Sequence, residues 1–367
     1  MQEVSYSVQN KSGFMSELRE QVAAYFENNH LSENGNLNLF LKTIFMFAVF
    51  LTPYFLLLFG VIHSLHGVFI SYVIIGLGQA GVGMAVMHDA NHRSYSKNKV
   101  VNRWMSKSLY LLGGFPATWQ YQHNTMHHGY TNIDGKDEDI NPGPVLRLSP
   151  HKPLLKIHKY QHIYAWFLYG LMTLLWITVK DFKQLYRYHK NNVPLSEKYS
   201  YNQMLMTLIF SKILYYIAFV VVPVIILPFA WYWIVIAFLI MHFVSGFILS
   251  VIFQTAHVIP TSEYPLPDKN GDMENNWAVH QLYTTSDFAP KNKILGWFIG
   301  GLNCQVEHHL FPNISHVHYH KISDIVKKTA RKYGLPYHAQ RSFFKAVIQH
   351  GKMLNKLGLD LYTSPAI

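Results

Sequence analysis

Apolar residues in this chain of 367 residues gather in long runs that contain no positive charge. Neither Lys nor Arg occurs from residue 60 to 87 or from residue 213 to 268. Because about 20 consecutive apolar residues cross a bilayer as a helix, these regions and their flanks predict transmembrane segments. The expected transmembrane helices cover residues 39–59, 68–87, 205–227 and 231–253.

The turns between these helices indicate how the chain is oriented. Residues 61–67 join the first two helices and Pro228 lies between the last two, and neither turn contains Lys or Arg. Positive residues concentrate in cytoplasmic segments, so both turns should lie on the opposite side. The pattern predicts an all-α integral membrane protein with four transmembrane helices in two hairpins and a helical cytosolic cap. Its expected regions, all of one domain, are a cytosolic segment 1–38, a hairpin 39–87, a cytosolic or interfacial region 88–204, a hairpin 205–253 and a cytosolic region 254–367.

The N-terminal segment has a pattern of its own. The first 37 residues carry charges and contain no apolar core of a cleavable signal. Phe14, Leu18 and Val22 recur every four residues beside charged positions, which predicts an amphipathic helix. Such a helix could lie on the membrane surface, or it could pack within the cap, and the sequence supports both equally.

Composition narrows the class of partner. The net charge of +11 lies outside the apolar runs, so the mean hydropathy of +0.07 averages membrane helices with large polar regions. The basic residues are dispersed among carboxylates, which argues against nucleic acid and favours anionic lipid or a phosphate-bearing acyl carrier. The single cysteine, Cys304, excludes an intramolecular disulfide and a thiolate cluster.

Histidines carry the candidate chemistry, and most of them occur in three clusters. The clusters run from His88 to His92, from His123 to His128 and from Gln305 to His309. Neutral imidazole is a common ligand of iron, copper and zinc, and residues four apart share a helix face. Next neighbours point about 100° apart, so adjacent histidines can reach a second metal. Because one ion takes only about four to six ligands, these imidazoles predict two metals.

Topology decides which further histidines can join them. The first cluster and His257 directly follow the second and fourth expected helices, at their cytoplasmic ends. The second and third clusters can share a site only if residues 163–179 lie in the interface or re-enter without crossing; separate single-metal sites would avoid this condition. His63 and His66 lie in the far turn. His242 lies about 22 Å along the helix from His257, which is too far for both to bind one metal. We expect it to form a hydrogen bond in the helix bundle or to line a substrate channel.

The order and spacing of the clusters resemble those of a known family. His-Asp-x-x-His, His-x3-His-His and Gln-x2-His-His, set around two membrane hairpins, are similar to the histidine boxes of the membrane-bound fatty acid desaturases. Residues 300–312 (Gly-Gly-Leu-Asn-Cys-Gln-Val-Glu-His-His-Leu-Phe-Pro) resemble the front-end branch, which is linoleoyl-CoA desaturase-like and has Gln at the first position of the third box. The resemblance extends from residue 14 to residue 358. It implies an enzyme that inserts a cis double bond between an existing one and the carboxyl end of an acyl chain.

The resemblance also implies two iron ions, dioxygen as co-substrate and electrons from an external redox protein. Removing hydrogen from an unactivated methylene requires an oxidant made from oxygen, which redox-inert zinc cannot supply. Gln305 occupies a ligand position, and it could contact the metal directly or through a water molecule. Asp89 and Glu307 are expected to accept hydrogen bonds from the imidazole N–H groups that do not face the metal. For His257, which matches the family's additional histidine, a helix-end cap is the alternative. The implied ligands are His88, His92, His123, His127, His128, His257, His308 and His309.

Polar residues near the boxes have weaker claims to a role in the site. For His280 and Gln281, loop packing is favoured over contact with substrate or with a ligand. For Trp119, Gln120 and Tyr121, packing is favoured over lining the acyl channel.

Two more polar groups remain outside the expected ligand set. For His316, His318 and His320, a solvent or donor-surface role is favoured over a metal site. For Asp137 and its neighbours Glu138 and Asp139, a solvated loop is favoured over hydrogen bonds to the second box.

The sequence departs from its relatives at two points. No His-Pro-Gly-Gly haem motif occurs near the N-terminus, so a fused cytochrome b5 domain is not expected, and a separate cytochrome b5-like or ferredoxin-like protein should supply the electrons. Cys304 stands where relatives often have an aromatic residue, which leaves regiochemistry open. The acyl substrate could be linked to CoA or to lipid, and the membrane could be a bacterial inner membrane or the endoplasmic reticulum.

Two other functions compete with a desaturase. A fatty acyl hydroxylase on the same scaffold shares the first hydrogen abstraction, and only the mass of the product separates the two. A membrane metal-binding or transport protein would carry ionisable residues through its spans. The expected spans hold little beyond Lys42 and His242, which favours the enzyme.

Overall fold

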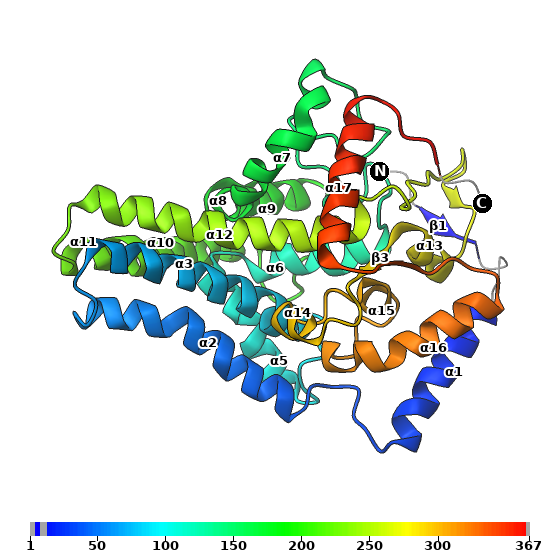
Figure 1. Cartoon of the computed structure of the whole chain (residues 1–367), viewed down its shortest axis with the longest axis horizontal. Coiled ribbons are helices and arrows are strands. Elements are labelled where there is room, and N and C mark those ends of the chain that lie inside the picture. Colours follow the sequence, from blue (N-terminus) through cyan, green and yellow to red (C-terminus); the bar gives the residue numbers. More distant parts are fainter. Residues whose placement is uncertain (1–3, 8–12, 365–367) are drawn as a thin grey trace. The chain divides into compact units, whose positions relative to one another are not determined.

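The computed structural model describes residues 4–7 and 13–364, and this part of the chain is mostly helical. It forms two compact units (Figure 1). The cap unit comprises the described residues of 1–36, 122–165 and 251–367. The membrane unit comprises residues 37–121 and 166–250.

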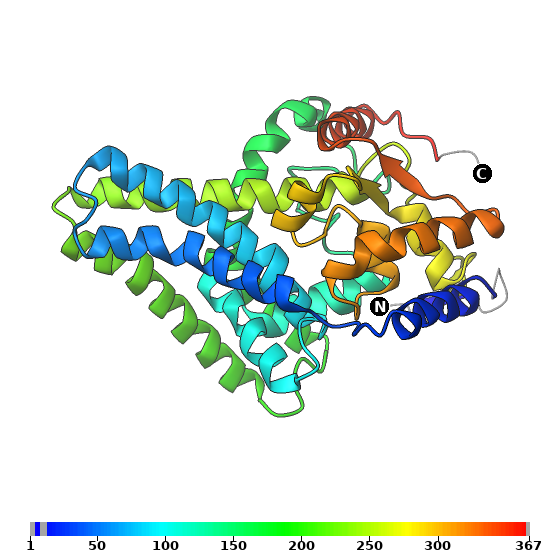
Figure 2. The same cartoon turned by 60° about the horizontal axis from the view of Figure 1, so that its bottom comes forward.

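The membrane unit begins with a helical hairpin. Helices α2 (Leu37–Leu58) and α3 (Leu65–Val82) lie side by side in both views (Figures 1 and 2). They pack closely because Gly78 has no side chain; a Cβ there would lie 2.5 Å from the backbone nitrogen of Phe50. The chain then continues through a π-helical turn into α4, so that one helix extends from Leu65 to Asn91. The remaining helices assigned to this unit are α4 (His88–Asn91), α5 (Lys99–Ser106), α6 (Pro116–Gln120), α8 (Met172–Leu175), α9 (Asp181–Lys190), α10 (Tyr201–Tyr216) and α11 (Val222–Ile226).

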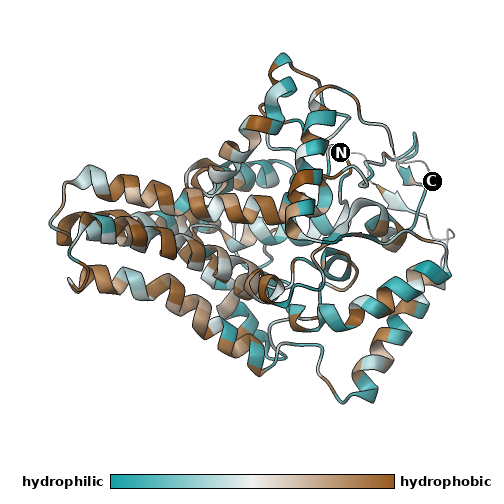
Figure 3. Ribbon diagram, in the orientation of Figure 1, coloured by the Kyte–Doolittle hydropathy of each residue, from teal (hydrophilic) through white to brown (hydrophobic). Residues whose placement is uncertain are grey.

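Four helices in the described part of the chain are long and apolar enough to cross a membrane. The second pair consists of α10 with α11, which form the span Tyr201–Ile226, and α12 (Trp231–His257). Figure 3 shows hydrophobic residues along all four. The predicted fold class is therefore confirmed, and the chain is a multi-pass membrane protein. The second and fourth helices extend beyond their expected ends, so His88 and His257 lie on them rather than after them, and both histidines are buried.

The difficult segment 163–179 is part of a bent helix pair. Residues 156–170, which end in α7 (Gln161–Gly170), and residues 172–190 meet at an angle of 57°. Such a break occurs both in a broken span and in a re-entrant segment. The expected non-crossing path therefore stays a prediction.

The first helix of the cap unit is α1 (Gly13–Asn28), which lies beside α16 (Tyr319–Lys332) in both views (Figures 1 and 2). The stripe of Phe14, Leu18 and Val22 is buried in a core that includes Ile322 and Val326 of α16. Of the two alternatives for this amphipathic helix, the packing helix is the one observed. Its stripe is not available to lipid.

Short parallel strand pairs and four further helices complete the cap unit. Strand β1 (Ser5–Tyr6) pairs with β2 (Asp272–Met273), and β3 (Ser286–Phe288) pairs with β4 (His338–Gln340). Gly301, at φ 67°, turns the chain just before the third box; a Cβ there would lie 2.9 Å from His316. The remaining cap helices are α13 (Trp277–Thr284), α14 (Lys293–Phe298), α15 (Gln305–Leu310) and α17 (Phe343–Gly358).

Candidate metal centre

The second histidine box lies on a π-helical turn, Tyr121–His127, rather than on a regular α-helix. In a π-helix the residue five positions on returns to the same face. His123 and His128 therefore face one another, with their Nε2 atoms 3.3 Å apart. The wider turn thus brings the first and the last histidine of the second box together. Two nitrogens bound to one metal at octahedral or tetrahedral angles lie about 3.0–3.4 Å apart, so this separation fits a shared ion.

One group of three histidines in the cap unit has the geometry of a metal site. His127 comes from the second box, His257 from the end of α12 and His309 from α15. Each offers one ring nitrogen, and these three atoms all lie within 4.8 Å of one another. The side chains are 2%, 4% and 0% exposed, respectively, so they converge in a space shielded from bulk water.

In each of these three rings the Nδ1 atom has an oxygen partner. His127 Nδ1 lies 3.2 Å from both oxygens of Asp137, and His309 Nδ1 lies 2.8 Å from Gln281 Oε1. His257 Nδ1 lies 3.3 Å from the carbonyl of Thr284. Because these oxygens are acceptors, each Nδ1 carries the proton and each Nε2 keeps its lone pair. The three buried Nε2 atoms have no hydrogen-bond partner among the described residues.

Asp137 is held inside the protein rather than in a solvated loop, so the favoured expectation for it was wrong. It is 1% exposed and accepts the backbone N–H groups of Asn132 and Asp139 as well as bonding to His127. Burial alone would raise the pKa of Asp137, but the charge and hydrogen bond of His127 and these N–H groups lower it. Asp137 therefore stays ionised and orients His127.

Asn132 joins this loop to the last turn of α12. It adopts a left-handed conformation, φ 59°, which Asn tolerates better than most residues. Its side-chain Nδ2 donates to the carbonyl of His257 over 3.0 Å. One residue therefore links the support of His127 to the backbone of His257.

Gln281 also contradicts its favoured expectation of loop packing. It lies on α13, is fully buried, and accepts from both His309 Nδ1 and Thr131 Oγ1, the latter over 2.9 Å. His280, on the same helix, bonds to the carbonyl of Thr131 over 2.8 Å. Burial lowers the pKa of His280 to about 4, so this ring is neutral at ordinary pH. Helix α13 thus fixes the orientation of His309 and supports the second box.

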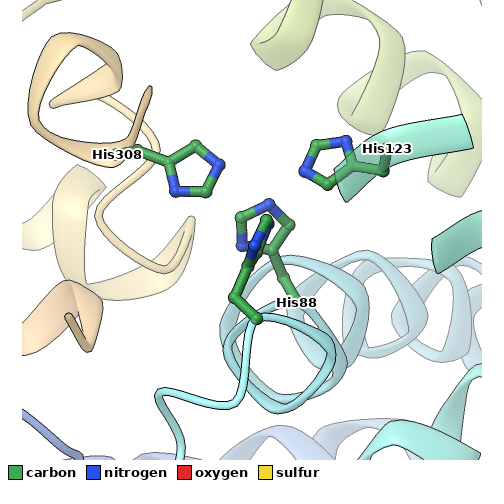
Figure 4. A group of neighbouring side chains, drawn as sticks. His88, His123 and His308 are labelled. Atoms are coloured by element: carbon green, nitrogen blue, oxygen red, sulfur yellow. The ribbon is translucent and has the colours of Figure 1, made fainter. Parts of the chain in front are cut away.

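The other face of the second box meets the third box. In Figure 4 the rings of His123 and His308 point toward one another, and their centroids lie 6.0 Å apart. His308 has a hydroxyl and an imidazole as neighbours. Its Nδ1 is 3.0 Å from Tyr319 Oη, and the centroid of its ring is 4.5 Å from that of the His128 ring. The rings of the adjacent His308 and His309 lie 5.6 Å apart, edge to face, with 84° between their planes.

The first box lies in the membrane unit, on the last turn of the helix Leu65–Asn91. His88, shown in Figure 4, and His92 are 2% and 5% exposed, with ring centroids 4.8 Å apart. Trp119 packs edge-on against both rings, at 5.9 and 6.4 Å. Gln120 donates to the side-chain oxygen of Asn91 over 2.7 Å. The expected packing role of residues 119–121 agrees with these contacts.

Glu307 has a different partner from the expected imidazole. Its Oε1 accepts from Tyr337 Oη over 2.9 Å, and the same hydroxyl lies 2.6 Å from Asp287 Oδ2. Burial raises the pKa of Asp287 to about 6, and burial and the charge of Asp287 raise that of Glu307. Tyr337 and a shared proton therefore hold these two carboxyl groups together behind the third box. Gln305 is fully buried beside His257, and Asp89 is buried on the first box.

Several histidines outside these groups are buried. His242 bonds to Tyr215 Oη through Nε2 at 3.0 Å and to Thr173 Oγ1 through Nδ1 at 3.1 Å, so the first of its two expected roles, a hydrogen bond in the helix bundle, is observed. His316 and His318 are each 5% exposed, and His318 Nε2 lies 3.2 Å from the carbonyl of Asn34. The expected solvent role is thus wrong for these two residues, whereas His320 is exposed.

The donor set fits transition metals better than alkaline earth ions. Three buried imidazoles whose Nδ1 atoms have oxygen partners and whose ring nitrogens lie close together form a donor set that suits iron, copper or zinc. Burial and the neighbouring imidazoles hold the pKa of His309 well below its ordinary value, which keeps this imidazole neutral.

Comparison with known proteins identifies the family. Residues 62–341 match the model of the fatty acid desaturase family. The chain belongs to this family. The sn-1 linoleoyl-lipid 6-desaturase of Arthrospira platensis is 32% identical over 95% of this chain and 93% of its own length. The sn-1 linoleoyl-lipid 6-desaturase of Synechocystis sp. is 31% identical, over 95% of this chain and 96% of its length. The acyl-lipid (8-3)-desaturase of Physcomitrium patens is 32% identical, over 97% of this chain and 74% of its length.

These findings confirm the resemblance drawn from the three histidine boxes. The desaturase is an oxidoreductase that acts on fatty acyl chains, and its relatives are of front-end types. A function as a fatty acyl desaturase is thus favoured over metal transport.

Proposed function

We propose that this desaturase is a di-iron, dioxygen-dependent, front-end acyl-lipid desaturase. The observation that carries the metal assignment is the group of His127, His257 and His309, whose protonated Nδ1 atoms and facing Nε2 atoms suit a metal ion. The preference for lipid-linked acyl chains rests on relatives named for linoleoyl-lipid and acyl-lipid substrates.

The proposed ligand set extends beyond this group. His123, His128 and His308 face one another in the cap unit, which supports a second ion there. His88 and His92, buried together on one helix end, complete the set by the family pattern. We include Gln305 as a direct or water-mediated neighbour of the metals, and Asp89 as a hydrogen-bond acceptor for a ligand. Glu307 acts through Tyr337 and Asp287 to hold the third box in place.

When bound, an iron pair supplies the oxygen-derived oxidant that an unactivated methylene requires, with electrons from a separate redox protein. The residues of the chain do the rest. Asp137 and Gln281 keep Nδ1 protonated and fix the ring planes of His127 and His309. Deep burial of the imidazoles excludes water, which protects a reactive site from side reactions. A cytochrome b5-like or ferredoxin-like donor would dock on the cytoplasmic face, where the positive-inside rule puts the cap.

A hydroxylase remains the nearest competing function, because both reactions begin with the same hydrogen abstraction. The products differ in mass: desaturation removes two hydrogens, whereas hydroxylation adds one oxygen. Product analysis therefore separates the two directly.

The test is fatty-acid profiling by gas chromatography and mass spectrometry in a host that expresses the chain together with a redox donor. The host receives mono- and di-unsaturated acids, and His308→Ala and His320→Gln serve as the inactive and active controls. We expect a product lighter by two hydrogens, with its new bond on the carboxyl side of the existing one, in the native chain and in His320→Gln only. Its earliest appearance in membrane lipids rather than in the acyl-CoA pool would support the acyl-lipid substrate. A hydroxylated product, or full activity of His308→Ala, would contradict the proposal.

A further inference from the structure

One surface of the cap unit exposes large apolar side chains among lysines. It consists of residues 154–160, which lead into α7, and the outward face of α17. Leu154, Leu155 and Ile157 are 47%, 43% and 50% exposed, and on α17 Phe344 and Ile348 are 74% and 42% exposed. We call this the lysine–apolar surface.

The two parts of the lysine–apolar surface are joined rigidly. Gln161 Nε2 donates to the carbonyl of Leu354 over 2.8 Å, and Arg147 Nη1 donates to that of Leu357 over 2.6 Å. Gly358 approaches so closely that a Cβ there would lie 2.1 Å from the carbonyl oxygen of His158. Figure 1 shows α17 beside the segment that leads into α7. Both parts therefore belong to one fixed surface.

Charge on this surface has a single sign. The sequence contains no Asp or Glu from residue 140 to 180 or from residue 340 to 359. The exposed lysines there are Lys156, Lys159, Lys345, Lys352 and Lys356. Helix α16 offers a contrast in the same unit: it also carries several lysines, but Asp324 lies among them and it exposes no large apolar residue.

We propose that the lysine–apolar surface lies on the headgroup region of an anionic bilayer, the one that the chain itself spans. Lysines would contact lipid phosphates while the apolar side chains enter the region just below them. Lipid is favoured over an acidic protein because the exposed apolar residues of the cap unit continue into α7 at Ile163 (65%), and the helix pair that contains α7 is apolar enough to enter a membrane. Helix α17 thus takes the membrane-surface role that α1, with its buried stripe, does not have.

The test uses the full chain in lipid nanodiscs with an environment-sensitive fluorophore on a single introduced cysteine. Cys304 is buried and should not react. The label is placed at Ile348→Cys on α17 and, as a matched control, at the exposed Lys328→Cys on α16. Spin-labelled lipids quench a fluorophore only near the bilayer. We expect quenching at residue 348 to exceed that at residue 328 by at least about threefold in discs that contain phosphatidylglycerol.

Charge reversal tests the electrostatic part of the proposal. Lys352→Glu and Lys356→Glu are combined in the Ile348→Cys background. For each lysine lost, the equilibrium constant for contact between α17 and the membrane, measured by the quenching, should fall by at least about fivefold. Lys327→Glu with Lys328→Glu on α16 should leave the quenching unchanged. All variants should keep the unfolding temperature of the native chain, which shows that they fold. Neutral phosphatidylcholine discs should reproduce the effect of the α17 pair.

Two results would overturn the proposal. Equal quenching at residues 348 and 328 would show that α17 does not meet lipid. A residue 348 label that lipid does not quench, but that changes its emission when an acidic two-iron ferredoxin is added, would assign the surface to protein docking instead. Both outcomes are independent of metal content and turnover, so they leave the desaturase proposal untouched.

Discussion

Three histidines of the cap unit and His242 of the membrane unit are all buried, but their ring nitrogens meet different groups. In the cap unit, His127, His257 and His309 use Nδ1 for an oxygen partner and present Nε2 to one another. In the membrane unit, His242 uses both nitrogens, one for Tyr215 and one for Thr173. In the first arrangement the Nε2 atoms have no hydrogen-bond partner among the described residues, whereas in the second both ring nitrogens have a hydroxyl partner.

The difference shows how a ligand histidine can be told from a structural one. Burial does not separate them, because burying any imidazole costs free energy unless its nitrogens are satisfied. The separating feature is the second nitrogen. Where several second nitrogens converge without donors, a metal is the natural partner; where a hydroxyl lies at hydrogen-bond distance, none is needed.

The sharpest way to break this comparison is to remove one histidine of each kind. In His309→Ala we expect the iron content to fall by about one ion per chain and the turnover to fall by more than about 100-fold. Mutation of a residue that only hydrogen-bonds to a metal ligand already lowers metal affinity or activity by about 10–100-fold. His242→Gln should keep full iron content and most of its activity. Metal analysis of the purified chains, with product analysis alongside, checks both. If the two variants lost iron equally, the distinction drawn from their nitrogens would be wrong.

A smaller effect is expected when the partner of a ligand is changed. Asp137→Asn removes the charge that holds His127 Nδ1–H, and we expect a loss of about 10–100-fold in iron affinity. The matched control is Asp134→Asn on the same loop, whose carboxylate pairs with Lys152 at 3.2 Å instead. The rate of iron loss to a chelator measures the difference. Equal rates in the two variants would mean that Asp137 does not support the site.

Acid should destabilise the cap unit through a buried histidine that binds no metal. Burial lowers the pKa of His350 to about 4, and its Nδ1 lies 2.7 Å from the carbonyl of Val258. Between pH 6.5 and about 4 the unfolded chain binds this proton and the folded chain does not, so stability is present above pH 6.5 and is lost as the pH falls. The contribution is about 3 kcal/mol.

Thermal unfolding against pH compares His350→Gln with the native chain. The variant should lose less stability than the native chain between pH 6.5 and 4.5. The exposed His320→Gln, on α16, should follow the native curve. A His350→Gln curve as steep as the native one would assign the acid sensitivity to other groups.

The smallest expected effect lies in the membrane unit. Thr173→Val removes the hydroxyl that bonds to His242 Nδ1 and should lower the free energy of unfolding by about 1 kcal/mol without altering iron content. Thr178→Val is the matched control, because its exposed hydroxyl bonds only within its own helix. A change in iron content on Thr173→Val would connect the two kinds of histidine that the account separates.

Much of the fold and the family could be predicted because the signals are long or repeated. Four apolar runs predict four helices, and three ordered boxes predict the family. The helix ends could not be predicted as well: α12 continues to His257 and the helix Leu65–Asn91 carries the first box, because buried polar residues can extend an apolar helix. The position of α1 could not be predicted either, because a periodic apolar face does not show whether lipid or protein covers it.

The supports of the site were harder to predict than the histidines themselves. Asp137 lies in an acidic run that looks solvated, and its burial depends on Asn132 and on a chain turn that spacing does not encode. Gln281 had one usable signal: with His280 it forms a polar pair between the apolar Val279 and Leu282 on a helix, which suggests buried hydrogen-bond partners. The register of His123 and His128 depends on a π-helical turn, which the sequence pattern does not reveal.

The most direct test of the central claim is the iron count of the purified chain, measured by mass spectrometry together with protein concentration. The account predicts about two irons per native chain, about two in His242→Gln and fewer in His309→Ala. Zinc in place of iron, a single ion per native chain, or full iron occupancy in His309→Ala would contradict it.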